Sequence, residues 1–377
     1  MRNSHCIFFR SDLRYDGRIC SLIRTLANTY PDDKVYLYEL IDSNYTFSDL
    51  PSNVEFRSPK LFSNLFKNNA IFKRLRIVEY AFYAFFFMLF HRLKTVQVHH
   101  EMVCLGPLLY KLIYRKTKLV YNDQELYHPK DRNIPSYLYW IEFFVIKYCD
   151  LVIITNEYRR KALLYIHKNR IDKYIIVDNY VFSPEIIMLD SSLTKGLQKL
   201  KSDKKKILLH QGGLSENRGM SSLVKIAEVI PNDWVLIFIG AKDYMFKDFK
   251  ELCKKEYHSK ILNFGYVDYS QLNSFYQHVD ASVLFYDSST FNNKYCAPNR
   301  LYSAVNNGLP IIVNSDNVTL TDFVAKYDNG VVFPGIENVN DFFNDYNNLK
   351  KNSSNLRSKF EYKEDIVDLK LFYNNLC

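Results

Sequence analysis

Glycine and arginine residues that could bind a phosphate group lie close together in the second half of the chain. The segment 210–219 reads HQGGLSENRG and follows a short β-rich run. Paired glycines let backbone amides approach a ligand closely, and an arginine at a helix start offers forked N–H donors to phosphate oxygens. Gly212, Gly213 and Arg218 are therefore predicted to contact a phosphate.

A second anion site is predicted at the start of a later helix. The segment 292–310 reads NNKYCAPNRLYSAVNNGLP, in which Pro298 suits the first helical turn and Asn307-Gly308 ends the helix. The N-terminus of a helix has unpaired amides and the positive end of the helix dipole. Pro298, Asn299 and Arg300 are therefore predicted to lie beside a bound anion.

Alternating β-rich and helical patterns must position these loops. Six β-rich runs occupy 5–9, 34–40, 95–100, 118–122, 150–155 and 174–179, and six more occupy 206–210, 234–240, 260–265, 280–286, 309–314 and 330–333. This alternation predicts parallel α/β sheets, in which ligands bind beyond the carboxyl ends of the strands. The lysine-rich stretch 195–206 separates the two series, so two doubly wound domains are expected.

The expected boundaries follow from this restart of the pattern. An N-terminal domain spans 1–180, a linker spans 181–205, a C-terminal domain spans 206–354, and a terminal helical segment spans 355–377.

Composition narrows the class of protein. The 377 residues are 47% hydrophobic and 24% charged, which is typical of a globular protein. Lys plus Arg is 50 and Asp plus Glu is 41, so the net charge of +9 favours anionic partners. Nucleic acid is the least expected of them, because no basic and aromatic motif of the known modules occurs.

Cysteines and the N-terminus predict a cytoplasmic location. The seven cysteines are scattered and none is in a CxxC spacing, which argues against a disulfide framework and a zinc site. The first apolar run is too short for the core of a signal peptide, so secretion is not supported.

One apolar run could contact a membrane. Residues 77–90 form a stretch of roughly 14 residues, interrupted by Glu79, which is shorter than the roughly 20 needed to cross a bilayer. Its flanks are basic, with Lys73, Arg74, Arg76, His91, Arg92 and Lys94. This pattern fits a helix on an anionic membrane surface, and it fits a buried helix of the N-terminal domain better, so both interpretations stay open.

The motifs of the second half resemble the C-terminal domain of the GT-B glycosyltransferases, specifically the large retaining GT4 family. The resemblance is carried, in order and spacing, by HQGGLSENRGM, NFGYVDYSQLNSFYQHVDASVLFY and NNKYCAPNRLYSAVNNGLPIIV. The first half resembles the family more weakly, through DGRI at 16–19 and YNDQEL at 121–126. The resemblance implies a GT-B fold, with two Rossmann-like domains facing each other across a cleft.

The resemblance also implies a donor site. Arg218 would hold the donor diphosphate, Gly212 and Gly213 would line the phosphate loop, and the loop of Tyr266 would lie against the nucleobase. Arg218 and Arg300 would neutralise the leaving diphosphate without a metal, because no DxD-like pair occurs near a donor loop. No cofactor is implied besides the nucleoside-diphosphate sugar as co-substrate.

The sequence departs from the family at three positions. Many relatives have two glutamates separated by seven residues, and the corresponding positions are Tyr295 and Ser303. Because the second glutamate is expected to bind the ribose, Ser303 should contact it more weakly or not at all. Gln124 stands where relatives often have a histidine that contacts the sugar; it can form a hydrogen bond but cannot carry a proton.

Three residues of the first half are assigned to the acceptor side: Asp16, Arg18 and His100. Adjacent residues of a strand point to opposite faces, so at most one of His99 and His100 is expected to reach the cleft. Asp123 and Glu125 are expected to cap or orient their loop.

The expected activity is that of a metal-independent, retaining hexosyltransferase. It would move a sugar from a nucleoside-diphosphate sugar to a glycan or lipid-linked acceptor, in bacterial surface polysaccharide synthesis, at the inner face of the plasma membrane. Two alternatives remain open. One is a catalytically silent GT-B partner subunit, favoured by the missing glutamates and by Gln124. The other is a nucleotide-sugar epimerase on the same fold.

Overall fold

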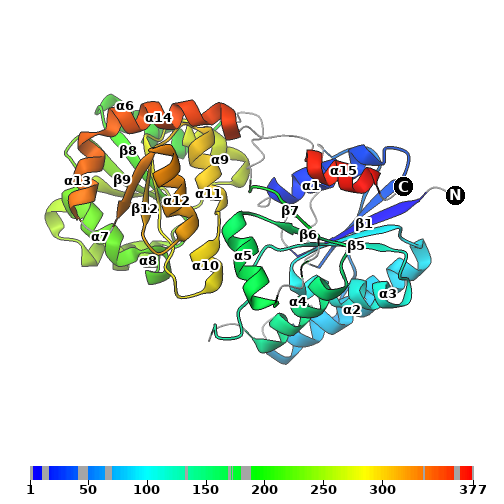
Figure 1. Cartoon of the computed structure of the whole chain (residues 1–377). Coiled ribbons are helices and arrows are strands. Elements are labelled where there is room, and N and C mark those ends of the chain that lie inside the picture. The colour runs from blue at the N-terminus through cyan, green and yellow to red at the C-terminus, as the bar shows by residue number, and fades with distance from the viewer. Residues whose placement is uncertain are drawn as a thin grey trace. The chain divides into compact units, whose positions relative to one another are not determined.

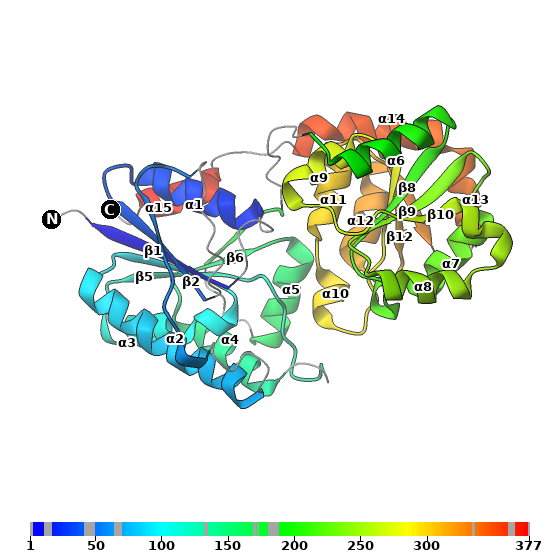
Figure 2. The ribbon, with the colours of Figure 1, turned by 180° about the vertical axis from the view of Figure 1, so that it is seen from behind.

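Two compact units make up the chain in the computed structural model (Figures 1 and 2). The first comprises Met1–Asp178 and Lys363–Cys377, and the second comprises Asn179–Tyr362. The structure describes residues 3–10, 17–40, 50–63, 70–131, 135–168, 171, 173–179, 188–333, 336–360 and 366–375.

A seven-stranded parallel sheet forms the centre of the first unit, in the order β3-β2-β1-β4-β5-β6-β7. The strands are β1 (Ser4–Phe9), β2 (Lys34–Glu39), β3 (Val54–Arg57), β4 (Thr95–His99), β5 (Lys118–Asn122), β6 (Leu151–Ile154) and β7 (Tyr174–Ile176). The direction of winding reverses between β1 and β4. Ligands of doubly wound sheets bind at such a switch point.

Helices cover both faces of this sheet. They are α1 (Gly17–Thr29), α2 (Ala70–His91), α3 (Leu105–Ile113), α4 (Ser136–Tyr148), α5 (Glu157–Ile166) and α15 (Val367–Asn374). Because side chains alternate along a strand, Ile7 and Phe9 pack in the core that α1 and α15 cover, whereas Phe8 contacts Tyr80 of α2 on the other face. Helix α3 contacts both α2 and α4 on that second face.

A six-stranded parallel sheet forms the centre of the second unit, in the order β10-β9-β8-β11-β12-β13. The strands are β8 (Lys206–Gln211), β9 (Trp234–Ile239), β10 (Ile261–Asn263), β11 (Ala281–Leu284), β12 (Ile311–Asn314) and β13 (Gly330–Phe333). Its switch point lies between β8 and β11.

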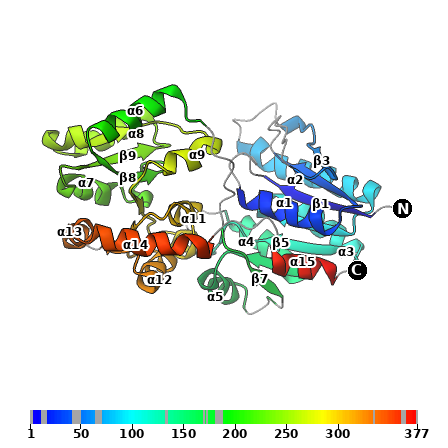
Figure 3. The ribbon, with the colours of Figure 1, turned by 90° about the horizontal axis from the view of Figure 1, so that it is seen from above.

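The second unit, whose ribbon is seen from above in Figure 3, has a core on each side of its sheet. One core includes α6 (Ser191–Ser202), α9 (Tyr269–Tyr276), α11 (Asn299–Asn306) and α12 (Val318–Tyr327). The other includes α7 (Met220–Val229), α8 (Asp243–Leu252) and α13 (Ile336–Asn344), and α14 (Tyr346–Leu356) contributes to both.

The predicted fold class is confirmed, and two details differ from the expected organisation. Within the expected linker 181–205, Ser191–Ser202 form helix α6, whose Leu193, Leu197 and Leu200 are buried in the second unit. The expected terminal segment 355–377 is divided: α14 ends in the second unit, while α15 packs against α1 of the first. Within the described residues, no helix is both long and apolar enough to cross a membrane.

Candidate active site

Glycines bring three loops together at the carboxyl edge of the second sheet. Gly212, directly after β8, has φ +118°, and Gly240, after β9, has φ +80°. A Cβ on Gly240 would lie 3.5 Å from the Cα of Gly212, and the amide of Gly240 donates to the carbonyl of Gly265 after β10. Because these three residues have no side chains, backbone atoms line the carboxyl edge of the sheet next to its switch point. Gly213 is exposed, and a Cβ there would meet no other atom.

Two arginines lie against one tyrosine ring at this switch point. Arg218 ends a short 3₁₀ helix, η4 (Glu216–Arg218), and its guanidinium lies 4.2 Å from the centre of the Tyr286 ring. The guanidinium of Arg300, in the first turn of α11, lies 4.6 Å from the same ring centre. Arg300 also donates from Nε to the Tyr286 hydroxyl at 3.1 Å, and from Nη1 to the carbonyl of Gln211.

Neither guanidinium has a carboxylate partner. In the described part of the chain neither Arg218 nor Arg300 forms an ion pair, and Nη1 of Arg218 and Nη2 of Arg300 are buried without a hydrogen-bond partner. Arg300 is only 8% exposed. A buried cation is costly unless it is paired, so this arrangement favours binding of an anion. Two forked donors suit a phosphate group.

His210, in β8, is buried near the two arginines and carries no charge near neutral pH. Burial, together with the charges of Arg300 and Arg218, lowers the pKa of its imidazole to about 3. Its Nε2 lies 3.5 Å from the carbonyl oxygen of Gly213. The positive charge of the site therefore comes from the two arginines.

Helix α11 positions the remaining predicted donor residues. Pro298 is its N-cap residue, Asn299 is exposed, and Ser303, one turn after Arg300, is buried. Tyr295 ends the preceding helix, α10 (Phe291–Tyr295). Asn317 fixes the turn between the two helices, because its amide donates to the carbonyls of Asn293 at 2.6 Å and Cys296 at 3.0 Å.

The structure brings Gly212, Arg218 and Arg300 together, and it adds Tyr286, which the sequence analysis did not single out. Tyr286 follows β11, the strand next to β8 across the switch point. The strand order, once known, points to the loops after these two strands. Tyr266 is 65% exposed and follows Gly265 in the loop after β10, at the same edge.

The first unit has a polar cluster at its own switch point. His100 follows β4 and has φ +81°, which is rare for a residue other than glycine. Its Nε2 lies 3.3 Å from Nη1 of Arg10, which follows β1. Its Nδ1 lies 3.0 Å from a carboxylate oxygen of Glu101 and accepts from the amide of Met102 at 3.3 Å. These contacts hold the partly exposed ring in one orientation.

The neighbouring residues of this edge are mostly buried. His99 is fully buried between Gln97 and Asn122, with ring nitrogens 2.7 Å from each side-chain amide. After β5, the carboxylate of Asp123 accepts a buried hydrogen bond from Nε of Arg159 at 2.5 Å. This ion pair anchors the loop that presents the half-buried Gln124.

Glu125, in the same loop, remains accessible to solvent. Loss of hydration around its carboxyl group raises the pKa of Glu125, while the charges of Arg159 and His100 oppose the shift.

Two predicted acceptor-side residues have no described side chain. Asp16 lies outside the described residues, and Arg18 is the second residue of α1, with its side chain also outside them. Among the residues that the structure does describe, no group of three or more His, Cys, Asp and Glu side chains could hold a metal ion.

Comparison with known proteins gives one matching family and many similar folds. Residues 195–365 match the family Glycosyl transferases group 1. No curated protein sequence matches the chain.

Solved structures align over nearly the whole chain. Anabaena HepE in complex with UDP is 16% identical, with a TM-score of 0.68, over 100% of this chain and 99% of HepE. A glycosyltransferase from Rickettsia africae is 13% identical, with a TM-score of 0.71, over 99% and 97%. Sucrose-phosphate synthase from Thermosynechococcus elongatus is 12% identical, with a TM-score of 0.70, over 99% and 98%. At these identities the likeness establishes the fold.

Proposed function

We propose that the chain, which has a GT-B fold and matches the family Glycosyl transferases group 1 over residues 195–365, transfers a sugar from a nucleoside-diphosphate sugar to a glycan or lipid-linked acceptor. The observation that carries the proposal is the pair of arginines, Arg218 and Arg300, which lie against Tyr286 without a carboxylate partner in the described structure. A nucleoside diphosphate supplies the charge that this pair lacks.

The proposed mechanism places the two cations where charge develops. Breaking the glycosidic bond to the diphosphate leaves negative charge on the phosphate oxygens. Preorganised donors at that position lower the barrier, because they need no reorganisation as the charge forms. Arg218 and Arg300 act as these donors, without a metal ion. Retention of the anomeric configuration is proposed from the family.

A uridine nucleotide is the first candidate for the donor. Two of the similar structures are complexes of Anabaena HepE with UDP and with UDP-glucose, which supports testing UDP before other bases. Tyr266 offers an exposed ring to a nucleobase. Ser303 and Tyr295 supply no carboxylate for the ribose, so we expect ribose binding to depend on other groups.

The acceptor side is assigned to the first unit. His100 is the described candidate, since it is partly exposed at the carboxyl edge of β4 and held by Arg10 and Glu101. Asp16 and Arg18 remain proposals of the same kind. We propose synthesis of a bacterial surface polysaccharide at the cytoplasmic face of the membrane, with helix α2 in contact with anionic lipid.

Nucleotide titration tests the donor site. Calorimetry with UDP, GDP and CMP should show selective binding, which Arg218→Ala and Arg300→Ala each weaken by about tenfold or more. Arg357→Ala is the matched control, because Arg357 is an exposed arginine of the same unit. If both site variants bind UDP as tightly as the wild type, the assignment of these arginines is wrong.

Turnover separates the remaining alternatives. Donor hydrolysis or transfer in excess EDTA is expected from a metal-independent enzyme. Tight UDP binding with neither reaction, in the presence of a range of acceptors, would favour the silent partner subunit. Interconversion of free nucleotide sugars would identify an epimerase.

A further inference from the structure

Three neighbouring helices of the first unit expose large apolar side chains on their outer faces. On α2, Phe82, Phe86 and Phe90 recur at intervals of four residues, and Phe90 is 83% exposed. On α4, Tyr137, Trp140, Phe144 and Tyr148 recur at intervals of three and four residues. Between them, α3 exposes Leu109, Leu112 and Ile113.

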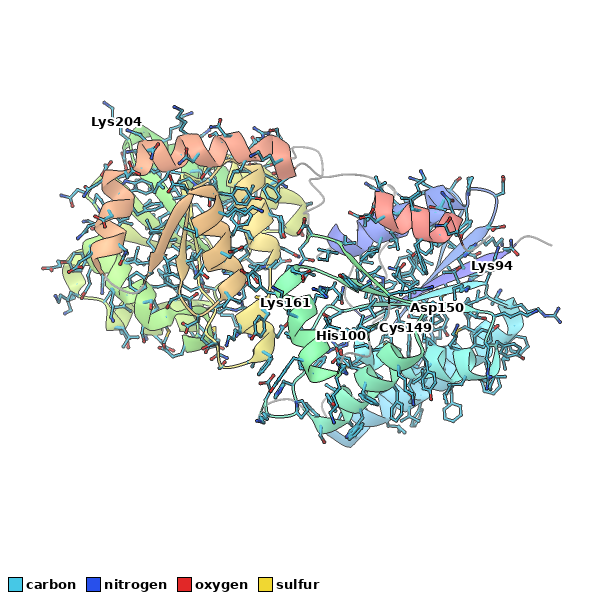
Figure 4. All side chains as sticks on the ribbon, viewed as in Figure 1. Lys94, His100, Cys149, Asp150, Lys161 and Lys204 are labelled. Atoms are coloured by element: carbon cyan, nitrogen blue, oxygen red, sulfur yellow. The ribbon has the colours of Figure 1, made fainter. Side chains whose placement is uncertain are left out.

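This spacing places each set along one side of its helix, because residues three and four apart are neighbours on a helix surface. The opposite sides are buried: Tyr80, Ala84 and Met88 of α2 and Leu138 and Val145 of α4 have almost no exposed area. The helices are thus apolar on the side that normally faces water. We call the exposed sides of α2, α3 and α4 the aromatic face (Figure 4). A continuous apolar surface of this kind marks an interaction site.

Basic residues follow the aromatic face where its helices end. Arg92 follows α2, Arg115 and Lys116 follow α3, and Lys147 lies in the last turn of α4, all four of them exposed. All three helices run antiparallel to the strands they cover, so these ends lie along the same edge of the unit.

Acidic residues contribute little to the aromatic face. The three helices contain two, Glu79 and Glu142. Glu142 is fully buried, where it accepts from the hydroxyl of Tyr121 at 3.1 Å. Glu79 accepts from the backbone amides of Phe62 and Ser63. The face is therefore apolar, and its edge is basic apart from Asp150, which pairs with Lys111 of α3.

We propose that the aromatic face binds the surface of an anionic lipid bilayer. An apolar helix side enters the boundary between headgroups and acyl chains, and tyrosine and tryptophan are favoured at that depth. Arg92, Arg115, Lys116 and Lys147 lie where their long side chains can reach anionic headgroups. From the sequence alone, membrane contact was one of two interpretations of residues 77–90, which lie in α2; the structure adds α3 and α4.

A second copy of the chain fits this face less well. In a symmetric dimer the same patch meets itself, so the basic edge would need acidic residues that the face lacks. An anionic bilayer supplies both the apolar layer and the opposite charge. This inference rests on the proposed function only in explaining why a bilayer matters, namely a lipid-linked acceptor; vesicle binding is measured without any transfer reaction.

Flotation with vesicles tests the proposal. The full chain is mixed with vesicles of phosphatidylcholine alone or of phosphatidylcholine with phosphatidylglycerol, at low and high salt. We expect binding to the anionic vesicles, weakened by salt. Trp140→Ser with Phe144→Ser, and separately Phe86→Ser with Phe90→Ser, should weaken it about tenfold or more. Arg92→Gln with Lys116→Gln should weaken it about fivefold for each charge removed.

The matched control is Tyr244→Ser with Leu252→Ser on α8, because these side chains are about as exposed but belong to the second unit. It should bind like the wild type. Circular dichroism and the unfolding transition of every variant check that the fold is retained, and UDP titration in solution tests the donor site independently. Vesicle binding in a chain that fails to bind UDP would overturn the proposed donor and leave the aromatic face standing.

Three results would overturn the bilayer proposal. The first is no flotation of the wild type, and the second is equal loss in the control and in both aromatic pairs. The third is a wild-type dimer in solution that the aromatic substitutions convert to a monomer, with no vesicle binding in either form. That result would show that a second copy covers the face.

Discussion

Tyr286 resolves an electrostatic problem in the second unit. Two guanidinium groups at short range repel each other, and neither has a carboxylate among the described residues. The electron-rich face of an aromatic ring attracts a cation, and its hydroxyl accepts from Arg300. The tyrosine can therefore hold both arginines in position before an anion arrives. A preorganised pair loses less conformational entropy when it binds a phosphate.

Two substitutions of Tyr286 should distinguish the contribution of its hydroxyl to UDP binding from that of its ring. Tyr286→Phe keeps the ring and removes the acceptor of Arg300, so we expect UDP to bind about fivefold more weakly. Tyr286→Leu removes both and should weaken binding by about tenfold or more. Calorimetry measures the affinities, and Tyr302→Phe, on the same helix as Arg300, is the control. Unchanged UDP binding by Tyr286→Leu would show that the ring does not position the arginines.

His210 should make the second unit sensitive to acid. Its folded pKa of about 3 lies below the usual value of 6.5, so the unfolded chain binds the proton more readily. Stability is therefore unaffected well above pH 6.5 and falls as the pH decreases from 6.5 towards 3. At pH 5 the imidazole alone should cost about 2 kcal/mol.

The variant His210→Phe removes this proton linkage. The free energy of unfolding of the variant minus that of the wild type should increase by about 2 kcal/mol when the pH is lowered from 7 to 5. Urea denaturation at the two pH values measures the difference. A constant difference would mean that the imidazole can be protonated in the folded protein.

Helix α6 shows why composition misleads about elements. Its lysines suggested a solvated linker or a helix face, and only the spacing of Leu193, Leu197 and Leu200, which are buried at intervals of four and three residues, indicates the helix. That spacing predicts one apolar side of a helix, whereas the charged residues describe only its outer side. Both series of strands were predicted, because buried parallel strands are nearly continuous apolar runs. The short edge strand β3 was not, since its side chains are only partly buried.

The candidate site, like the helices and strands, could be predicted from the sequence only in part. Gly212, Arg218 and Arg300 stand out as residue types suited to phosphate. Tyr286 does not, because its role depends on β11 lying beside β8, which only the sheet order reveals. In the same way, no local pattern indicates that α15 returns to the first unit.

The packing of α15 can be tested within one helix. Leu369 is fully buried in the core of the first unit, whereas Leu371, two residues later, is 55% exposed. Leu369→Ala should lower the free energy of unfolding by about 2 to 5 kcal/mol, and Leu371→Ala should change it by less than about 0.5 kcal/mol. Denaturant titration followed by circular dichroism gives both values. Equal effects of the two substitutions would show that α15 does not pack in this register.

At the scale of the whole molecule, each unit has its own sheet and its own cores. All the described groups assigned to the donor diphosphate belong to the second unit, and the aromatic face belongs to the first. The net charge of +9 suits both proposed anionic partners, the diphosphate and the bilayer. The diphosphate is proposed to bind through the half-buried Arg218 and the buried Arg300, and the bilayer through an exposed surface.

This division predicts where a bound donor stabilises the chain. A ligand stabilises the state to which it binds, by about 2.7 kcal/mol when its concentration is 100 times the dissociation constant. Saturating UDP should therefore slow amide hydrogen exchange in β8, η4 and α11, which hold Gly212, Arg218 and Arg300, and in the core strands of the second unit. Exchange followed by mass spectrometry measures this, with Arg218→Ala at the same UDP concentration as the control that should show less slowing. Protection confined to strands β1 to β7 would place the nucleotide in the first unit and refute the donor assignment, while leaving the fold unchanged.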